Sequence, residues 1–185
     1  MQTQDTLERV PLGPTGIQVS PLGIGAWAWG DAFFWQYGKD HSDADIETAY
    51  QASLAHGINF FDTAEVYGLG RSERLLGQYA RAAGWPVVVA SKFFPFPWRV
   101  SKWHQRRALR KSLERLGMER IALYQLHWPF PPVPIDTWMD GLADAVEAGL
   151  VQAVGVSNYN VEQMQRAHAA LARRGIPLAS NQVEY

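Results

Sequence analysis

Cysteine is absent from the 185-residue sequence, which excludes disulfide bonds, thiolate metal sites and cysteine nucleophiles. Long apolar runs are absent too, since no segment approaches the roughly 18 consecutive apolar residues that a membrane helix requires. Residues 1–9 are polar and of mixed charge, unlike the basic start and apolar run of a secretory signal. We therefore expect a cytoplasmic protein with no membrane partner.

An excess of either charge is also missing, because 17 Lys and Arg residues are balanced by 18 Asp and Glu residues. The resulting net charge of -1 provides no basic field for nucleic acid and no strongly acidic field for cations. With 47% hydrophobic and 19% charged residues, the composition is that of a globular protein. We expect no nucleic-acid partner, and the composition leaves the oligomeric state open.

Short apolar runs alternate along the chain with segments of helical periodicity. We expect strands at residues 22–27, 59–62, 87–92, 121–127, 151–157 and 179–184, and helices at 42–56, 72–81, 101–116, 135–148 and 160–174. This alternation requires a parallel sheet with right-handed crossovers, in either an open doubly wound sheet or a (β/α)8 barrel. No linker interrupts it, so residues 1–185 form a single domain.

Two features at the chain ends bear on the barrel alternative. Residues 9–20 carry a Gly-Pro-Thr-Gly turn between apolar residues and predict a β-hairpin, which would plug the N-terminal end of a barrel. Only six strands are present, and eight are needed to close such a barrel. We therefore expect a C-terminally truncated TIM barrel, in which Ile24 and Val183 lie exposed at the gap between the first and sixth strands.

Polar residues close the apolar runs, at the end of a parallel sheet where function usually collects. These residues are Asp62, Ser91, Lys92, His127, Ser157, Asn158, Asn181, Gln182 and Glu184, with Tyr67 five positions after Asp62. Lys92 follows a valine-rich strand, and a buried ammonium must be paired. Asp62, on the neighbouring strand, is the obvious partner.

This set of side chains suits the reduction of a carbonyl, whose oxygen gains charge and must be protonated. A tyrosine with a pKa of about 10 is too weak an acid unless a cation favours its anion. Lys92 would supply that cation to Tyr67, and Asp62 would hold Lys92 in place. His127 would donate a hydrogen bond that orients the carbonyl oxygen. Ser157, Asn158 and Gln182 offer donors and acceptors that match a carboxamide, such as that of nicotinamide.

The sequence resembles that of the aldo-keto reductases in a series of segments that occur in the family's order. They are residues 22–27 (Leu-Gly-Ile-Gly-Ala-Trp), 59–68 (Asn-Phe-Phe-Asp-Thr-Ala-Glu-Val-Tyr-Gly), 72–73 (Ser-Glu), 76–77 (Leu-Gly), 91–92 (Ser-Lys), 126–129 (Leu-His-Trp-Pro), 155–159 (Gly-Val-Ser-Asn-Tyr) and 181–185 (Asn-Gln-Val-Glu-Tyr). The second segment, with Ser-Glu downstream, is highly specific for the family.

The resemblance implies a (β/α)8 barrel and a catalytic tetrad of Asp62, Tyr67, Lys92 and His127. It implies NADPH as the cofactor, with the nicotinamide carboxamide held by Ser157, Asn158 and Gln182, and with Gly25, Trp27 and Asp62 as further cofactor-binding residues. The implied substrates are small-molecule carbonyls: aldehydes, ketones, sugars and quinones. The family's seventh and eighth strands, with the segment that grips the adenosine phosphates, are missing, so this chain alone need not be active.

Two alternatives to carbonyl reduction stay open. One is a regulatory subunit that senses the cofactor and turns over slowly, as do ion-channel β subunits that resemble this family. The other is a metal-dependent barrel hydrolase using Asp62, His127 and Glu184, against which the lack of a second strand-end histidine counts. A group of loop aromatics indicates an apolar or planar substrate, unless each simply fills the core: Trp29, Trp35, Phe93, Phe94, Trp98 and Phe130.

Overall fold

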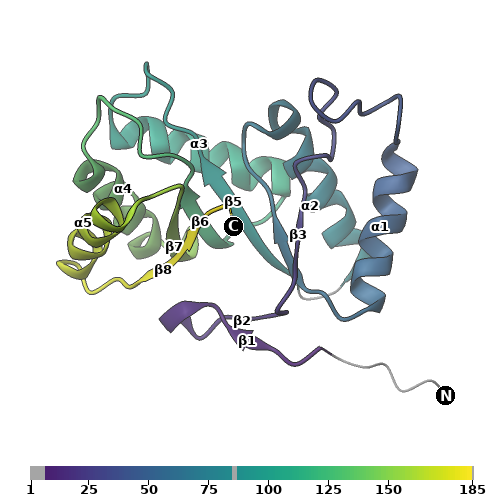
Figure 1. The fold of residues 1–185 in the computed structure, drawn as a ribbon, viewed down its shortest axis with the longest axis horizontal. Coiled ribbons are helices and arrows are strands. Elements are labelled where there is room, and N and C mark those ends of the chain that lie inside the picture. Colours follow the sequence, from purple (N-terminus) through teal and green to yellow (C-terminus); the bar gives the residue numbers. More distant parts are fainter. Residues whose placement is uncertain (1–6, 85–86, 185) are drawn as a thin grey trace.

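In the computed structural model, which describes residues 7–84 and 87–184, six parallel strands form one curved sheet in sequence order (Figure 1). They are β3 (Gly23–Gly25), β4 (Phe60–Asp62), β5 (Val88–Phe93), β6 (Ile121–Leu126), β7 (Val151–Ser157) and β8 (Leu178–Gln182). Consecutive neighbours joined by helices are the arrangement of a (β/α)8 barrel, here a partial one. The predicted fold class is confirmed.

The strand register brings the carboxyl ends of the strands to one level. Gly25 lies beside Asp62, Asp62 beside Ala90, and Lys92 beside Gln125. A register shift interrupts the pairing of β7 with β8 near Val154. Polar residues that close separate apolar runs therefore meet at one edge of the sheet.

Five α-helices of the described part of the chain cover one face of the sheet (Figure 1). They are α1 (Asp43–Ala55), α2 (Arg71–Ala83), α3 (Lys102–Leu116), α4 (Ile135–Glu147) and α5 (Val161–Ala172). The start of α5 shows why the sequence begins a helix there. Asn160 Oδ1 accepts a hydrogen bond from the Gln163 backbone at 2.9 Å, and Gln163 Oε1 accepts one from the Asn160 backbone at 3.0 Å. This is the predicted capping box.

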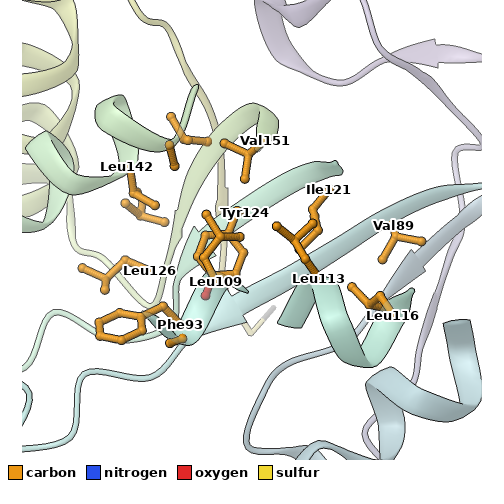
Figure 2. Close-up of a cluster of buried hydrophobic side chains, with 14 of the residues drawn as sticks. Val89, Phe93, Leu109, Leu113, Leu116, Ile121, Tyr124, Leu126, Leu142 and Val151 are labelled. Atoms are coloured by element: carbon orange, nitrogen blue, oxygen red, sulfur yellow. The ribbon is translucent and has the colours of Figure 1, made fainter. Parts of the chain in front are cut away.

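The main core lies between the helices and the sheet (Figure 2). Leu109, Leu113 and Leu116 lie on one side of α3, at helical spacing, and pack against alternate residues of the strands, such as Val89 and Tyr124. Burying each such side chain contributes about 1.5–3 kcal/mol. This core positions the strand ends that carry the polar residues.

The opposite face of the sheet is closed at its amino end by the N-terminal hairpin (Figure 1). The hairpin consists of β1 (Val10–Pro11), the 3-10 turn η1 (Gly13–Thr15) and β2 (Gln18–Val19), with β1 and β2 antiparallel. Ile17 and Val19 pack with Ala90, Leu123 and Ala179. The expected hairpin is present, and it covers the amino end of the strands as predicted.

Two details of the first strand differ from expectation. The strand ends at Gly25, so Trp27, whose side chain is 42% exposed, lies in the following loop. Ile24 was expected at the open gap but is half-buried and packs in the helix-side core, because alternation along β3 turns the flanking glycines the other way. Val183, by contrast, is exposed beyond β8.

No helix in the described ranges has the length and apolarity needed to cross a membrane.

Candidate active site

A buried ion pair lies at the carboxyl end of the sheet. Lys92 Nζ donates hydrogen bonds to Asp62 Oδ1 at 2.7 Å, to Asp62 Oδ2 at 2.6 Å and to the Thr63 carbonyl at 3.1 Å. The Lys92 side chain is only 1% exposed. Burial lowers the pKa of Lys92, whereas the charge and hydrogen bonds of Asp62 oppose that shift. Lys92 is therefore held by three acceptors in a fixed position.

Tyr67 begins the short 3-10 helix η2 (Tyr67–Gly70), and its hydroxyl lies 3.4 Å from Lys92 Nζ. The segment with Tyr67 and Gly68 lies close to the loop that follows β3. Gly68 has a φ of +52°, and a Cβ there would lie 2.4 Å from the Gly30 carbonyl oxygen. Only glycine fits this approach.

The ionisation of Tyr67 differs from expectation. Burial, followed by the charge of Asp62, raises the pKa of Tyr67 above its ordinary value of 10. We expected Lys92 to lower it. The larger cause is burial of the phenol, and the charge of Asp62, whose two oxygens both accept hydrogen bonds from Lys92, raises the pKa further. The resting phenol is therefore held in its protonated form.

His127 directly follows β6, and its backbone nitrogen donates to the Phe93 carbonyl at 3.0 Å. Its ring meets that of Tyr67 edge-on, with centroids 5.8 Å apart. Burial, together with the positive charge of Lys92, lowers the pKa of His127 from 6.5 to about 3. The imidazole is thus neutral at physiological pH and can donate one hydrogen bond. Its Nδ1 is buried without a hydrogen-bond partner among the residues described.

Three further polar residues join this group through hydrogen bonds. Ser157 Oγ donates to the Gln182 carbonyl at 2.9 Å, and Asn158 Nδ2 donates to the His127 carbonyl at 3.1 Å. Gln182 Nε2 donates to Asp62 Oδ2 at 3.0 Å. Within the described ranges, the amide oxygens of Asn158 and Gln182 accept no hydrogen bond. A carboxamide needs acceptors for its NH₂ and donors for its oxygen, so this set fits one.

The two remaining candidates border the site. Gly25 lies next to Asp62 at the end of β3, and a Cβ built there meets open space. Trp27 stacks on Tyr67 with ring centroids 5.8 Å apart, and its Nε1 donates to Asp31 at 3.2 Å. The structure thus brings all the candidate residues to one end of the sheet.

A buried polar network on the helix side of β5 was missed by the sequence analysis. Glu73 is fully buried; it accepts a hydrogen bond from Ser91 Oγ at 2.6 Å and forms an ion pair with Arg115. Beside it, Ser72 and Thr63 share a hydrogen bond of 2.7 Å. The Ser-Glu motif signalled this network, but Arg115 lies too far along the chain for spacing to reveal the pair.

The loop aromatics divide into two groups. Trp29 and Phe93 are buried in the main core, so for these two the alternative that they fill the core holds. Trp35, Trp98 and Phe130 are exposed, and Phe94 is half-buried with its ring 5.5 Å from that of His127. An apolar surface therefore adjoins His127, formed by part of the predicted set.

The hydrolase alternative gains no support from the geometry. Glu184 is exposed after the end of β8, whereas Asp62 is bonded to Lys92 and Gln182. Across residues 7–84 and 87–184, no three His, Cys, Asp or Glu side chains are grouped closely enough to hold a metal ion.

Comparison with known proteins places this geometry in a family. The chain is 41% identical to a chloroplastic pyridoxal reductase of Arabidopsis thaliana, covering 96% of this chain and 52% of the relative. It is 30% identical to a probable voltage-gated potassium channel subunit beta of the same plant, over 88% of this chain and 50% of the relative. The chain thus spans about half the length of these curated relatives.

Solved structures and family models agree with these relatives. A crystal structure of the thermostable aldo-keto reductase Tm1743, in complex with the inhibitor epalrestat, superposes with a TM-score of 0.82 and 26% identity. The match covers 97% of this chain and 63% of that one. A model of the aldo/keto reductase family matches residues 21–185. The chain therefore belongs to the aldo/keto reductase family.

Proposed function

We propose that the protein reduces aldehydes or ketones to alcohols with NADPH, using Tyr67 as the proton donor. The observation that carries this proposal is the position of Lys92 Nζ, which is bonded to both oxygens of Asp62 and lies 3.4 Å from the Tyr67 hydroxyl. A proton donor, a cation that stabilises its anion and a carboxylate that fixes the cation are the parts that carbonyl reduction needs.

The four side chains divide the work of protonating a carbonyl oxygen. Neutral His127 donates a hydrogen bond that orients the oxygen. Tyr67, protonated at rest because of its raised pKa, gives its proton to that oxygen as charge develops there. Lys92 then stabilises the phenolate, which carries a negative charge that the resting phenol lacks. Asp62 acts through Lys92 by keeping the ammonium within reach of Tyr67.

The cofactor proposal rests on the amide network beside the tetrad. When bound, the nicotinamide group supplies the hydride that the carbonyl carbon receives. Ser157, Asn158 and Gln182 hold the carboxamide, since the side-chain amide oxygens of Asn158 and Gln182 have no hydrogen-bond partner within the described chain. Gly25 leaves room beside Asp62, and Trp27 borders that space.

The substrate class follows from the surface next to His127. The Phe94 ring adjoins the imidazole and has its centroid 5.9 Å from that of Phe130, so an apolar or planar group next to the carbonyl would be covered there. Pyridoxal, the substrate in the name of the Arabidopsis relative, is a planar aromatic aldehyde and is our first candidate.

A second candidate is a regulatory subunit that binds the cofactor and turns over slowly. The similarity to a probable potassium channel subunit beta favours it, because the same tetrad would serve a sensor. Turnover separates the two candidates.

The test is to follow NADPH consumption by the full-length protein with pyridoxal, benzaldehyde, propanal and a simple ketone, and with NADH in place of NADPH. We expect repeated turnover with at least one aldehyde and a preference for NADPH. Tight NADPH binding with no more than a single slow turnover would favour the regulatory subunit. Failure to bind either nucleotide would contradict both candidates.

A further inference from the structure

We propose that Glu65 and Arg99 are positioning residues that hold Phe94 against His127, and that this makes the site selective for planar aromatic carbonyls over small aliphatic ones. The inference rests on the proposed reductase function. It concerns an ion pair that neither the tetrad nor the cofactor network uses.

Glu65 and Arg99 form a largely buried, two-pronged pair. Arg99 Nη1 donates to Glu65 Oε1, and Arg99 Nη2 donates to Glu65 Oε2 at 3.1 Å. The exposed fractions of the two side chains are 7% for Glu65 and 20% for Arg99. Such a fork fixes direction as well as distance. It joins the loop after β4 to the loop after β5.

The pair also holds both polar groups of the Phe94 backbone. The Phe94 nitrogen donates to Glu65 Oε1 at 2.8 Å, and Arg99 Nη1 donates to the Phe94 carbonyl at 2.9 Å. Phe94 lies just after the end of β5, where no strand partner would fix its backbone. Glu65 and Arg99, together with the Phe96 nitrogen that donates to the Phe94 carbonyl at 3.0 Å, therefore fix the backbone from which the Phe94 ring projects.

That ring is the centre of the apolar surface. Its centroid lies 5.5 Å from that of His127 with an interplanar angle of 83°, and 4.6 Å from that of Phe96. Edge-on packing of this kind has a preferred geometry, so a change in the Phe94 backbone would move the surface that faces the substrate.

The pair is coupled to the tetrad through the backbone. The Glu65 nitrogen donates to the Lys92 carbonyl at 3.4 Å, and Glu65 precedes Tyr67 by two residues. On the other side, Phe93 accepts the hydrogen bond from the His127 nitrogen. One ion pair thus sets the aromatic surface relative to both the proton donor and the residue that orients the carbonyl.

Stability alone does not account for charges in this position. Removing two charges from water costs free energy, and apolar residues of similar volume are often as good for the fold. An ion pair that also binds the backbone of one aromatic residue gives a defined geometry instead. We infer that geometry at Phe94 is its role.

The experiment compares benzaldehyde with propanal in steady-state kinetics of the full-length protein at saturating NADPH. The variants are Arg99→Met, Glu65→Gln and Phe94→Leu. For Arg99→Met and Phe94→Leu we expect KM for benzaldehyde to rise about tenfold, the size expected for one aromatic contact, with kcat changed less than threefold or so. For propanal we expect kcat/KM to stay within about threefold. Glu65→Gln keeps an acceptor for the Phe94 nitrogen and should show the smallest rise.

The matched control is Asp136→Asn, which removes the carboxylate that pairs with both Arg166 and Arg173, outside the site. It should change neither substrate's kinetics. Equal losses for both aldehydes in Arg99→Met and Phe94→Leu would show a merely structural role and overturn the inference, as would unchanged kinetics. If Arg99→Met does not fold, Phe94→Leu decides, since Phe94 is only half-buried. Wild-type protein that reduces neither aldehyde would instead overturn the proposed function.

Discussion

The two ends of the sheet are built from different chemistry. At the carboxyl end, Asp62, Lys92 and His127 are held by hydrogen bonds and a buried ion pair. At the amino end, Ile17 and Val19 of the hairpin region pack on apolar side chains of the strands. The first end keeps charges out of water, which costs free energy, whereas the second removes apolar surface from water, which stabilises the fold.

From this difference we expect activity to depend on the carboxyl end of the sheet and stability to depend on the amino end. Substitutions at the carboxyl end should abolish chemistry with modest effects on folding, and substitutions at the amino end should do the reverse. Natural active sites commonly give up stability for chemistry in this way.

The largest effect is expected for Lys92→Met. It removes the cation that we propose stabilises the Tyr67 phenolate, so carbonyl reduction by the full-length protein should fall by about 10²–10⁴-fold, the usual contribution of acid–base catalysis. Asp62→Asn should be milder, because it removes only the partner that positions Lys92. Steady-state rates with a small aldehyde measure both variants. If Lys92→Met and Asp62→Asn both kept near-normal rates of carbonyl reduction, the ion pair would have no part in catalysis.

The second prediction concerns the opposite end. Ile17→Ala deletes a buried side chain from the cluster between hairpin and sheet. The free energy of unfolding should fall by about 2–4 kcal/mol, as for other large-to-small core substitutions, with kcat unchanged. Urea denaturation measures the first quantity. Val10→Ala, at an exposed hairpin position, is the matched control and should change stability little. A drop in kcat for folded Ile17→Ala would break the separation.

The third prediction follows from His127. Because its folded pKa of about 3 lies below its ordinary value of 6.5, the unfolded chain binds a proton in that window that the folded chain does not. The stability from neutral His127 is complete above pH 6.5 and is lost as pH falls toward 3, by up to about 1.4 kcal/mol per pH unit. Denaturation across this range should show a pH dependence that His127→Gln reduces. An identical dependence in both proteins would mean that His127 is not kept neutral by the fold.

The smallest effect is expected at the helix surface. Arg173 pairs with Asp136 at 3.0 Å, but its side chain is 64% exposed. Exposed ion pairs contribute little, so Arg173→Ala should change the free energy of unfolding by less than about 1 kcal/mol and leave kcat unchanged. Thermal denaturation with and without added salt measures it. A loss as large as that from Ile17→Ala would show that the helix layer depends on ion pairs more than on its core.

Much of the fold could be predicted because its strands and helices follow from local sequence patterns. Apolar runs marked the strands, and the Asn160–Gln163 capping box marked the start of α5. The carboxyl ends of parallel strands lie at the same edge of the sheet, so polar residues at those ends could be predicted to lie close together. Tyr67 lies beyond the strand end and was found by its position five residues after Asp62, and the family motif contains it as well.

What could not be predicted depends on contacts between distant segments. The partners of Glu73 and Glu65 lie 42 and 34 residues away, and no spacing rule connects them. The raised pKa of Tyr67 also depends on three-dimensional placement, because it follows mainly from burial of the phenol and then from the charge of Asp62. The loop aromatics were ambiguous for the same reason: whether Trp29 faces the core or a pocket depends on how its loop folds back.

The central claim, that Tyr67 is the proton donor, is tested most directly by Tyr67→Phe in the full-length protein. The measurement pairs NADPH affinity, by fluorescence titration, with the rate of carbonyl reduction at saturating cofactor. The account predicts an affinity within a few fold of the parent protein and a rate lower by at least about 10²-fold, because the phenyl ring keeps the packing against Trp27 and His127 but has no proton to give. Near-normal reduction by this variant would contradict the claim.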